Sequence, residues 1–496
     1  MLGSVIAQAL QQHADRVVLT DAHNSHTAAQ VDLQVDRLAR ALAARYPPGA
    51  RILFFMRNRI EYVLLQLACE RAGLVRVPVN RLYTRGDVAR IVESARPVAL
   101  FYDADTAARA CALELADGPW LCSVDEEEWR QFLVGAPDLE LPAVRPDALC
   151  SLNFTSGTTG QPKGVMMSHA NWAAVYSNML IDRDIRSDDK FIHIGPLSHA
   201  SGAYIAPNLL RGAENILVDM RSPADLFAAI ERHRATVFAC VPTVLTRLIA
   251  DGSRHARNFA SLRRVIYGAE AIPPNTLRGA LEFFGPILVQ NYGLTEAMMT
   301  VCFRSEADHL RGGANCIGRP YSFVEVAMRD EQGRPVPDGA VGELTIRAGQ
   351  VMLGYWQMPE ATAAVLQDGW LKSGDLAVRD ADGRITLVGR AKDLVISGGF
   401  NIYPPEIEAW FCSLPGVIEA AVFGVPDADW GEKLVAIVAC DPAVAVTVDA
   451  LRGRAKADLG YKTPKLIEIR PGLPRTANGK IDKNALKQAM LANANH

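Results

Sequence analysis

The stretch 155–164 (TSGTTGQPKG) has residue types and a spacing that suit phosphate binding. Its three glycines let the backbone approach a ligand closely, its four hydroxyl side chains donate hydrogen bonds, and its lysine adds a cation. It follows an apolar run, 148–154, that predicts a buried strand, and it precedes 165–171, which can lead into a helix. A Walker loop needs a different order of Gly, Lys and Ser/Thr, and a plain hairpin turn is the alternative interpretation. The candidate phosphate ligands are Thr155, Ser156, Gly157, Thr158, Thr159, Gly160 and Lys163.

A second stretch, 290–296 (QNYGLTE), places an amide, an aromatic ring, a glycine, a hydroxyl and a carboxylate at the end of an expected strand. That mixture can serve a nucleotide and its metal ion. By itself it also fits an ordinary strand-to-helix turn capped by Thr295. Further motifs also combine glycines with polar or charged residues, and each motif alone would be interpreted as a turn or a solvated charged pair. They are 267–271 (YGAEA), 373–375 (SGD), 389–390 (GR) and 474–483 (PRTANGKIDK).

In this order and spacing, the motifs resemble the signatures of the adenylate-forming superfamily, in its AMP-forming acyl-CoA and aryl-CoA synthetase branch. The resemblance covers nearly the whole chain and implies an enzyme that activates a carboxylic acid with ATP and Mg²⁺. It implies that Lys480 reaches the α-phosphate and the substrate carboxylate. It also implies that Thr295 contacts the α-phosphate and that Glu296 holds the magnesium ion. The positive charges of Lys480 and of the magnesium ion would stabilise the negative charge that gathers in the phosphoryl-transfer transition state.

The same resemblance assigns the nucleoside contacts and a hinge. Asp375 matches the residue that accepts hydrogen bonds from both ribose hydroxyls, which an ionised carboxylate can do with its two oxygens. Arg390 matches an arginine that approaches ribose and phosphate, and Lys392 occupies the hinge position between two domains. The remaining cofactor-site residues implied in this way are Gly268, Ala269, Glu270, Asn291, Tyr292 and Gly293.

The group that receives the acyl moiety is indicated by the stretch 397–408, which resembles the segment that CoA ligases swing toward the nucleotide after adenylation. There Gly398 and Gly399 would leave room for the pantetheine arm of coenzyme A, although a loop glycine before a helix near Pro404 is the alternative. Trp430 lies where some aryl-CoA ligases stack an aromatic ring on the CoA adenine. The stretch 342–356 lacks the insertion found in fatty acyl-AMP ligases, which favours CoA. The alternative acceptor is the phosphopantetheine thiol of a carrier protein.

The acid is indicated by the residues that match the pocket side of the family site. His199, in 196–199 (PLSH), matches the residue that gates the acyl pocket, although a lone histidine is more often structural. No cation appears among the matched pocket residues, so a monocarboxylate with an apolar body is expected, either a medium-chain fatty acid or an aromatic acid. The candidate pocket residues are Ala203, Tyr204, Met298 and Met299.

The composition is that of an ordinary soluble protein. The net charge of −3 gives no electrostatic footprint for nucleic acid, and no apolar run is long enough for an integral membrane segment. Nine cysteines without a Cys-x-x-Cys pair indicate buried thiols in a reducing compartment. We therefore expect a cytoplasmic acid–thiol ligase, monomer or homodimer, whose ligands are a small carboxylic acid, ATP and CoA.

Apolar runs alternate with amphipathic stretches up to about residue 320, which predicts an α/β fold with mostly parallel sheets. Helices are expected at 27–44 and 60–72, and strands at 51–56, 74–79, 99–102, 191–194, 216–218, 237–241 and 264–267. After residue 320, short strands and turns predict a small antiparallel β subdomain. We expect an N-terminal adenylation domain at 1–389 and a mobile α+β C-terminal domain at 390–496.

Overall fold

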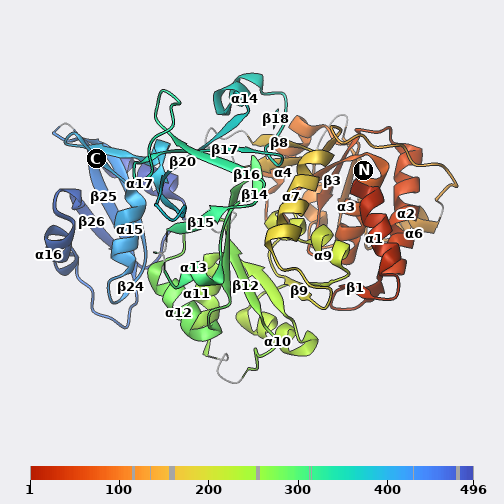
Figure 1. The fold of residues 1–496 in the computed structure, drawn as a ribbon, viewed down its shortest axis with the longest axis horizontal. Helices are drawn as coiled ribbons and strands as arrows, with labels where there is room; N and C mark the ends of the chain where they lie inside the picture. Colours follow the sequence, from red (N-terminus) through yellow and green to blue (C-terminus); the bar gives the residue numbers. More distant parts are fainter. Residues whose placement is uncertain are drawn as a thin grey trace.

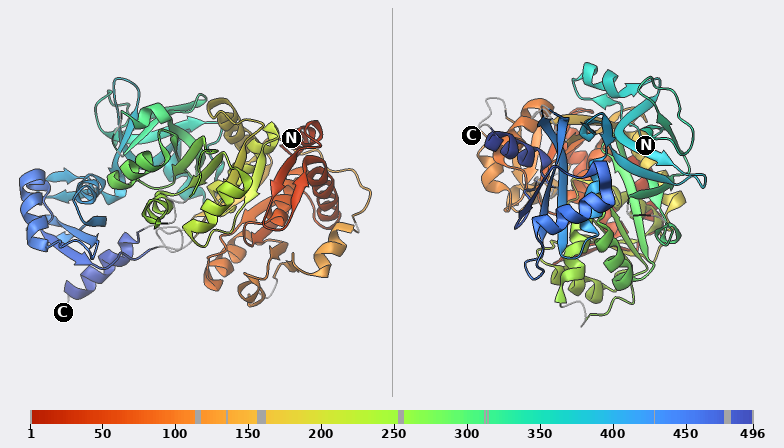
Figure 2. Two further views of the ribbon diagram at one scale, coloured as in Figure 1. Left: turned by 90° about the horizontal axis from the view of Figure 1, so that it is seen from below. Right: turned by 90° about the vertical axis from the view of Figure 1, so that its left-hand side faces the viewer.

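The computed structural model describes residues 2–113, 118–134, 136–155, 162–252, 257–311, 313, 315–427, 429–475 and 481–494. In this part of the chain the strands form three sheets. Figure 1 shows the N-terminal half on one side, the green middle of the chain at the centre and the blue C-terminal sheet at the opposite end. Figure 2 shows the same order from two further directions.

The first sheet has seven described strands in the order β18-β8-β7-β4-β3-β5-β6. Its centre is parallel, and β3 is buried along most of its length because Ile, Leu and Phe residues face helices on both sides. The end formed by β7, β8 and β18 is antiparallel. The strands are β3 (Arg51–Phe55), β4 (Val75–Pro78), β5 (Ala99–Tyr102), β6 (Trp120–Ser123), β7 (Leu149–Thr155), β8 (Lys163–Ser168) and β18 (Gly354–Tyr355).

The second sheet has 14 described strands and joins a parallel half to an antiparallel half. Strands β1, β10, β9, β11, β12 and β13 are parallel, and β14, β15, β21, β20, β17 and β16 continue the sheet in antiparallel pairs. The strands are β1 (Val17–Thr20), β2 (Ser25–Thr27), β9 (Lys190–His193), β10 (Glu214–Leu217), β11 (Val237–Cys240), β12 (Arg264–Gly268), β13 (Leu288–Leu294), β14 (Ala297–Arg304), β15 (Cys316–Pro320), β16 (Val324–Arg329), β17 (Gly342–Ala348), β19 (Leu366–Gln367), β20 (Trp370–Arg379) and β21 (Ile385–Arg390).

The third sheet has five described strands, all later in the chain than Arg390. Their inward faces form a core of their own around Phe411 of α15 and Ile407. The strands are β22 (Val395–Ser397), β23 (Phe400–Ile402), β24 (Val417–Asp427), β25 (Gly431–Cys440) and β26 (Leu466–Arg470). The boundary between domains at 389/390 stays a prediction.

Helices fill the space between the first two sheets. Helix α7 contacts β7 and β8 of one sheet and β14 of the other, and α2 packs on α1, α3 and the strands β1 and β2. The helices are α1 (Leu2–Gln12), α2 (Ala28–Arg45), α3 (Ile60–Ala72), α4 (Arg85–Ala95), α5 (Ala107–Cys111), α6 (Glu127–Val134), α7 (His169–Asp182), α8 (Ala200–Ala203), α9 (Ile205–Arg211), α10 (Pro223–His233), α11 (Pro242–Ala250), α12 (Pro274–Phe284), α13 (Glu306–His309), α14 (Pro359–Val365), η2 (Ala391–Asp393), α15 (Pro404–Cys412), α16 (Val448–Leu459), η3 (Gly460–Lys462) and α17 (Lys483–Ala494).

Local sequence signals explain where these helices begin and end. Helix α2 begins after Thr27, whose hydroxyl accepts from the backbone of Gln30 while the Gln30 side chain accepts from Thr27. That reciprocal capping satisfies two backbone donors that a helix start leaves without partners. Helix α3 ends at Gly73, whose φ of 69° lies in the left-handed region that glycine adopts without strain. Within the described residues, no helix is both long and apolar enough to cross a membrane.

The structure adds two details that the sequence patterns did not specify. The residues after the phosphate loop do not pass directly into a helix: Lys163–Ser168 is strand β8, paired with β7, and helix α7 begins only at His169. The antiparallel strands after residue 320 do not form a sheet of their own. They extend the large sheet through the pairing of β14 with β15, where the backbone of Phe303 lies opposite Arg319.

Candidate active site

The phosphate loop is the connection of a β-hairpin. Thr155 ends β7 and lies opposite Lys163, the first residue of β8. The expected ligands Ser156, Gly157, Thr158, Thr159 and Gly160 lie outside the described residues. Beyond the loop, a Cβ on Gly164 would lie 3.1 Å from the ring of Phe154 and 3.3 Å from the side chain of Trp356. Strand β8 is therefore packed closely against the segment that carries β18.

Glu296 lies in the tight turn between β13 and β14, where Leu294 pairs with Ala297. Both turn residues, Thr295 and Glu296, are half-buried. The Tyr355 hydroxyl donates a hydrogen bond of 2.7 Å to Oε1 of Glu296, and Lys163 Nζ lies 4.9 Å from the centroid of the same ring. Two residues that the sequence assigned to phosphate and metal are thus brought to one aromatic side chain.

The ribose carboxylate predicted at Asp375 is buried between two other candidate residues. Its Oδ2 accepts from the Tyr292 hydroxyl at 2.5 Å, and its Oδ1 accepts from Arg390 Nε at 2.9 Å. Asp375 and Arg390 face each other across β20 and β21, so the sheet register itself makes this pair. Burial raises the pKa of Tyr292, and the neighbouring carboxylate raises it further, so the phenol stays a donor.

The expected cofactor-site residues Gly268 and Asn291 lie on the neighbouring strands β12 and β13. Gly268 pairs with Asn291, and a Cβ on Gly268 would lie only 2.3 Å from the Asn291 carbonyl oxygen. Gly293 is similarly constrained, because its Cβ would lie 2.4 Å from the Cα of Met299. Ala269 has φ of 73°, an uncommon conformation for a residue with a side chain.

Glu270 has a clear structural contact. Its Oε1 accepts from the backbone N–H of Thr243 at 3.0 Å and from the Thr243 hydroxyl at 2.8 Å. Thr243 lies in the first turn of α11, where a carboxylate satisfies free N–H groups and favours the helix dipole. The carboxylate of Glu270 therefore ties the nucleotide segment to α11.

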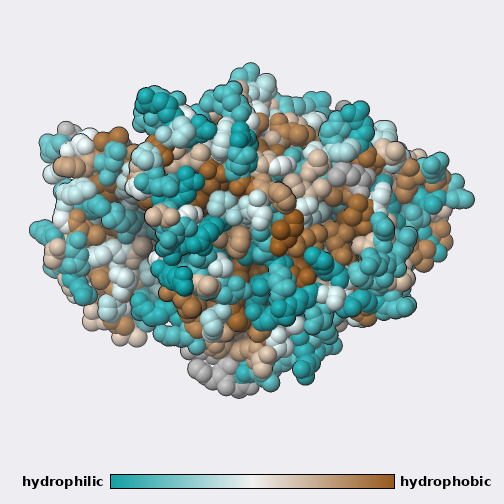
Figure 3. All heavy atoms as spheres, viewed as in Figure 1, coloured by the Kyte–Doolittle hydropathy of each residue, from teal (hydrophilic) through white to brown (hydrophobic). Residues whose placement is uncertain are grey.

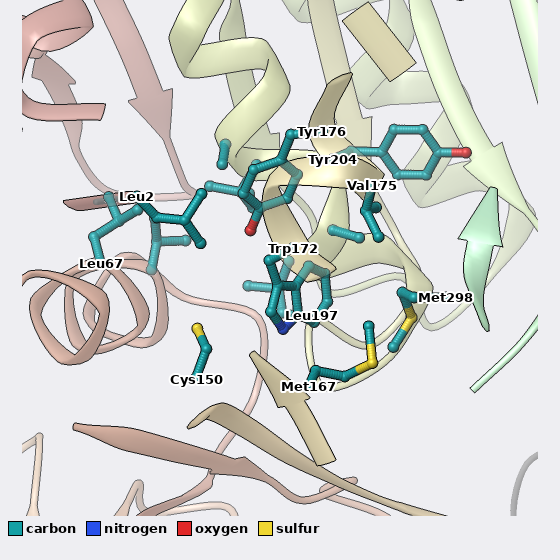
Figure 4. Packing of buried hydrophobic residues seen from close by; sticks show 14 of the residues in the cluster. Leu2, Leu67, Cys150, Met167, Trp172, Val175, Tyr176, Leu197, Tyr204 and Met298 are labelled. Atoms are coloured by element: carbon teal, nitrogen blue, oxygen red, sulfur yellow. The ribbon is translucent and has the colours of Figure 1, made fainter. Parts of the chain in front are cut away.

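The four expected pocket residues, Ala203, Tyr204, Met298 and Met299, are all buried. The Tyr204 hydroxyl accepts from Asn291 Nδ2 at 2.6 Å, and the ring stacks on Phe191. Figure 4 shows Met298 beside Leu197 and Met167, while the Tyr204 ring extends away from them with its hydroxyl outermost. Burial raises the pKa of Tyr204, so its hydroxyl is neutral. The pocket side and the nucleotide side of the site are joined through Asn291.

His199 is exposed and ends the half-buried loop just before α8. Its Nε2 is 3.4 Å from Asn80 Nδ2. A residue that the sequence analysis missed, Asn58, holds the loop: its Nδ2 donates to the Gly195 carbonyl at 2.8 Å, and its Oδ1 accepts from the Leu197 backbone at 3.0 Å. Asn58 follows β3, so the first sheet positions a loop of the second. Neither the type of Asn58 nor its position after a strand indicated this contact in the sequence.

The residues expected to meet the thiol lie in the third sheet. Gly398 and Gly399 form the two-residue turn between β22 and β23, with φ of 56° and 83°. The N–H of Gly398 donates to the carbonyl of Trp430, whose ring is half-exposed and carries Lys465 Nζ 3.8 Å from its centroid. Lys392 lies in the 3₁₀ turn η2 between the second and third sheets. Lys480 lies outside the described residues.

The structure thus brings together three predicted groups: Lys163 with Glu296, Asp375 with Tyr292 and Arg390, and Tyr204 with Asn291. Trp430 and the Gly398–Gly399 turn lie in a different sheet from these groups, at the blue end of the molecule in Figure 1. Tyr355 was missed although it stands in the quoted stretch 342–356, because neither its type nor its spacing indicated a contact with Glu296.

Comparison with known proteins decides the family. A model described as AMP-binding enzyme matches residues 6–356, and one described as AMP-binding enzyme C-terminal domain matches residues 406–480. The chain belongs to the AMP-binding enzymes. The resemblance to the adenylate-forming superfamily is confirmed.

Similar AMP-binding enzymes include a medium/long-chain-fatty-acid–CoA ligase of Mycobacterium tuberculosis, 31% identical, with 98% of this chain and 89% of that protein covered. A feruloyl-CoA synthase of an Amycolatopsis species is 36% identical, with 93% of each chain covered. Among solved structures, the amide bond synthetase McbA of Marinactinospora thermotolerans superposes with a TM-score of 0.91 at 31% identity, covering 99% of this chain and 100% of that one. The expected α/β fold with a C-terminal domain is confirmed.

Proposed function

We propose that this AMP-binding enzyme is an ATP-dependent carboxylic acid–CoA ligase. It joins the acid to AMP with release of pyrophosphate and then transfers the acyl group to the thiol of CoA. The observation that carries the proposal is the convergence of motif residues distant in sequence: Glu296 and Lys163 meet at Tyr355, and Asp375 meets Tyr292 and Arg390. The names of the similar fatty-acid–CoA ligase and feruloyl-CoA synthase support the choice of CoA.

Adenylation requires an anionic carboxylate to approach an anionic phosphate. In the proposed site, Lys163 and Lys480 supply positive charge to the phosphates, and Thr295 donates a hydrogen bond to the α-phosphate. Asp375 orients the ribose, because an ionised carboxylate has about four acceptor positions and its contacts with Tyr292 and Arg390 leave positions for hydroxyl donors.

The residues fit a magnesium ion that is held mainly by its nucleotide. Among the described residues, no group of three or more His, Cys, Asp or Glu side chains could hold a metal ion alone. Magnesium typically binds through one or two carboxylates, substrate phosphates and water, which matches the single carboxylate of Glu296. When bound, the ion neutralises charge on the phosphates.

For the acid, we propose an apolar monocarboxylate, either a medium-chain fatty acid or an aromatic acid. Its body would lie against Ala203, Met298 and Met299, which are buried and uncharged, beside the neutral hydroxyl of Tyr204. A charged group on the substrate would be costly there without a partner of opposite charge. The exposed side chain of His199, at the end of the loop held by Asn58, would gate the entrance between acid and thiol.

The proposal is tested with a panel of fatty and aromatic acids, following AMP and thioester by mass spectrometry with CoA and with a phosphopantetheinylated carrier protein. CoA thioester from at least one apolar acid is expected. Thioester on the carrier protein alone would replace CoA by the alternative acceptor, and no acid-dependent AMP would overturn the proposal.

Lys480→Ala provides the matched variant for the first half-reaction. We expect adenylation to fall at least about a hundredfold, the scale for removing one preorganised charge from a developing anion. A supplied acyl adenylate should still be converted to thioester. Near-normal pyrophosphate release by this variant would contradict the role of Lys480.

A further inference from the structure

The segment that carries Tyr355 joins the strand after the phosphate loop to the turn that holds Glu296. Met352 N–H donates to the Glu296 carbonyl at 2.8 Å. Leu353 N–H donates to the Met166 carbonyl at 2.9 Å, and Trp356 N–H donates to the Gly164 carbonyl at 2.7 Å. Figure 1 shows β18 beside β8, with which it pairs in antiparallel orientation. The backbone of one short segment therefore fixes two parts of the proposed phosphate site.

The side chain of Tyr355 makes the same connection with its two ends. It is 6% exposed, its hydroxyl donates to Glu296 Oε1 at 2.7 Å, and its ring lies 4.9 Å from Lys163 Nζ. The contact with Lys163 is a cation–π interaction, which holds an ammonium over a ring face. A carboxylate and an ammonium of opposite charge thus contact different parts of one buried ring.

The geometry of the contact makes the phenol the donor. The Tyr355 hydroxyl lies 2.7 Å from Glu296 Oε1, and an ionised carboxylate can only accept a hydrogen bond. The hydrogen bond occupies an acceptor position on Oε1 and leaves positions on the carboxylate for a cation. It also restrains rotation of the Glu296 carboxylate.

We propose that Tyr355 is a positioning residue for the magnesium–triphosphate site. Its hydroxyl fixes the carboxylate of Glu296 for the metal ion, and its ring fixes the ammonium of Lys163 for the phosphates. The inference rests on the proposed function, because it takes ATP with magnesium as the ligand. It adds a residue that touches neither reacting atom and acts through two residues that touch the ligand.

Tyr355→Phe tests the hydroxyl, because it keeps the ring and removes one hydrogen bond to a charged group. ATP binding is measured by isothermal titration calorimetry without acid or thiol, once with Mg²⁺ and once with EDTA. We expect the Kd with Mg²⁺ to rise about tenfold, the scale of a hydrogen bond to a carboxylate. The Kd with EDTA should stay within about twofold of wild type, because the ring still supports Lys163.

Two comparisons distinguish positioning from a general structural effect. Tyr102→Phe removes another phenol hydroxyl. The Tyr102 hydroxyl, at the end of β5, accepts from Cys111 Sγ of α5, so its loss should leave both Kd values unchanged. In a Glu296→Gln background, Tyr355→Phe should add little to the loss of magnesium-dependent affinity, because the two residues act through one contact. Independent, additive losses would overturn the proposal.

Tyr355→Leu tests the ring. With the cation–π contact also removed, affinity should fall both with Mg²⁺ and with EDTA. Equal weakening under both conditions in Tyr355→Phe, or no change in either, would overturn the positioning role in protein whose circular dichroism matches wild type. A wild-type protein that binds no ATP would overturn this inference and the proposed function together. A protein that shows the expected magnesium dependence but activates no acid would support the inference and overturn the proposed function.

Discussion

Asp375 illustrates how individual side chains prepare this site. Both of its oxygens already accept a hydrogen bond, from Tyr292 and from Arg390, and the residue is buried. A carboxylate held in this way has lost its rotational freedom before a ligand arrives, so less entropy is lost on binding. Tyr355 gives Glu296 a comparable restraint.

Gly399 gives a prediction at the same scale. A Cβ at this position would meet no atom within 4 Å, so a larger side chain would point into open space rather than into the protein. We expect Gly399→Leu to keep acid-dependent ATP/pyrophosphate exchange nearly intact and to lose thioester formation, because the side chain would block the pantetheine arm. Both half-reactions are measured separately, with a supplied acyl adenylate for the second.

The control for Gly399→Leu must carry the same backbone strain. Gly383→Leu does, because Gly383 is also a hairpin glycine with φ of 79° and no atom within 4 Å of an added Cβ. A side chain in this left-handed conformation costs about 1–2 kcal/mol in either variant. Equal loss of both half-reactions in Gly399→Leu would show that the glycine is structural, and full thioester formation would show that no pantetheine passes it.

At the scale of elements, the turn η2 connects the second sheet to the third. In this arrangement α15 packs against β21 and α12, and Asn275 Nδ2 of α12 donates to the Cys412 carbonyl at the end of α15. If the third sheet serves adenylation in one orientation and the thiol in another, these contacts must break when it rotates about η2.

Lys392 lies in the middle of η2, and Lys392→Pro tests the rotation. Proline fixes φ near about −65° and removes the backbone N–H, so we expect one arrangement to be trapped and one half-reaction to be spared. Lys392→Ala, which keeps the backbone free, should retain both. Both half-reactions at wild-type rates in Lys392→Pro would exclude a hinge at this position.

At the scale of the whole molecule, the described residues combine several separate apolar cores with buried polar groups. Figure 3 shows that polar residues cover most of one face and that apolar residues gather toward its middle. Three buried histidines, His169, His193 and His309, lie in different elements. Burial lowers the pKa of each to about 4.

Because of these three histidines, we expect the folded protein to lose stability in acid. Their pKa is lower in the folded state than the ordinary 6.5, so the unfolded chain binds more protons between pH 6.5 and 4. The stabilisation is complete above pH 6.5 and is lost as the pH falls toward 4, on the order of 3 kcal/mol for each histidine. The free energy of unfolding, measured in urea at pH 7.5, 6.0 and 5.0, should fall along this series.

The comparison of two variants isolates this effect from other titrating groups. Burial raises the pKa of Glu70. This shift affects stability in the opposite direction to the histidine shifts, because protonation of Glu70 favours the folded state at low pH. His309→Gln should make stability less dependent on pH, whereas His23→Gln, at an exposed position, should leave the dependence unchanged. Identical pH dependence in wild type and His309→Gln would contradict the assignment.

The sequence by itself determined the class of fold, the positions of most elements and the family. The helix predicted at 60–72 is α3, and the strand predicted at 99–102 is β5, because the spacing of apolar residues records which face of an element is buried. The motifs 155–164, 290–296 and 373–375 carried the resemblance to the family by their order and spacing, although each motif alone also fits an ordinary turn.

Only the tertiary structure decided which of these side chains meet. Tyr355 and Glu296 are 59 residues apart, and Tyr204 and Asn291 are 87 apart. Apolar periodicity says that a face is buried but not what it is buried against, so the contact of Tyr355 with Glu296 and Lys163 could not be predicted. The same holds for Glu270. The resemblance assigned it to the nucleotide site, whereas the packing of α11 gave its carboxylate a partner in Thr243. These pairings depend on the register and packing of whole sheets, which is a property of the folded chain and not of any local stretch.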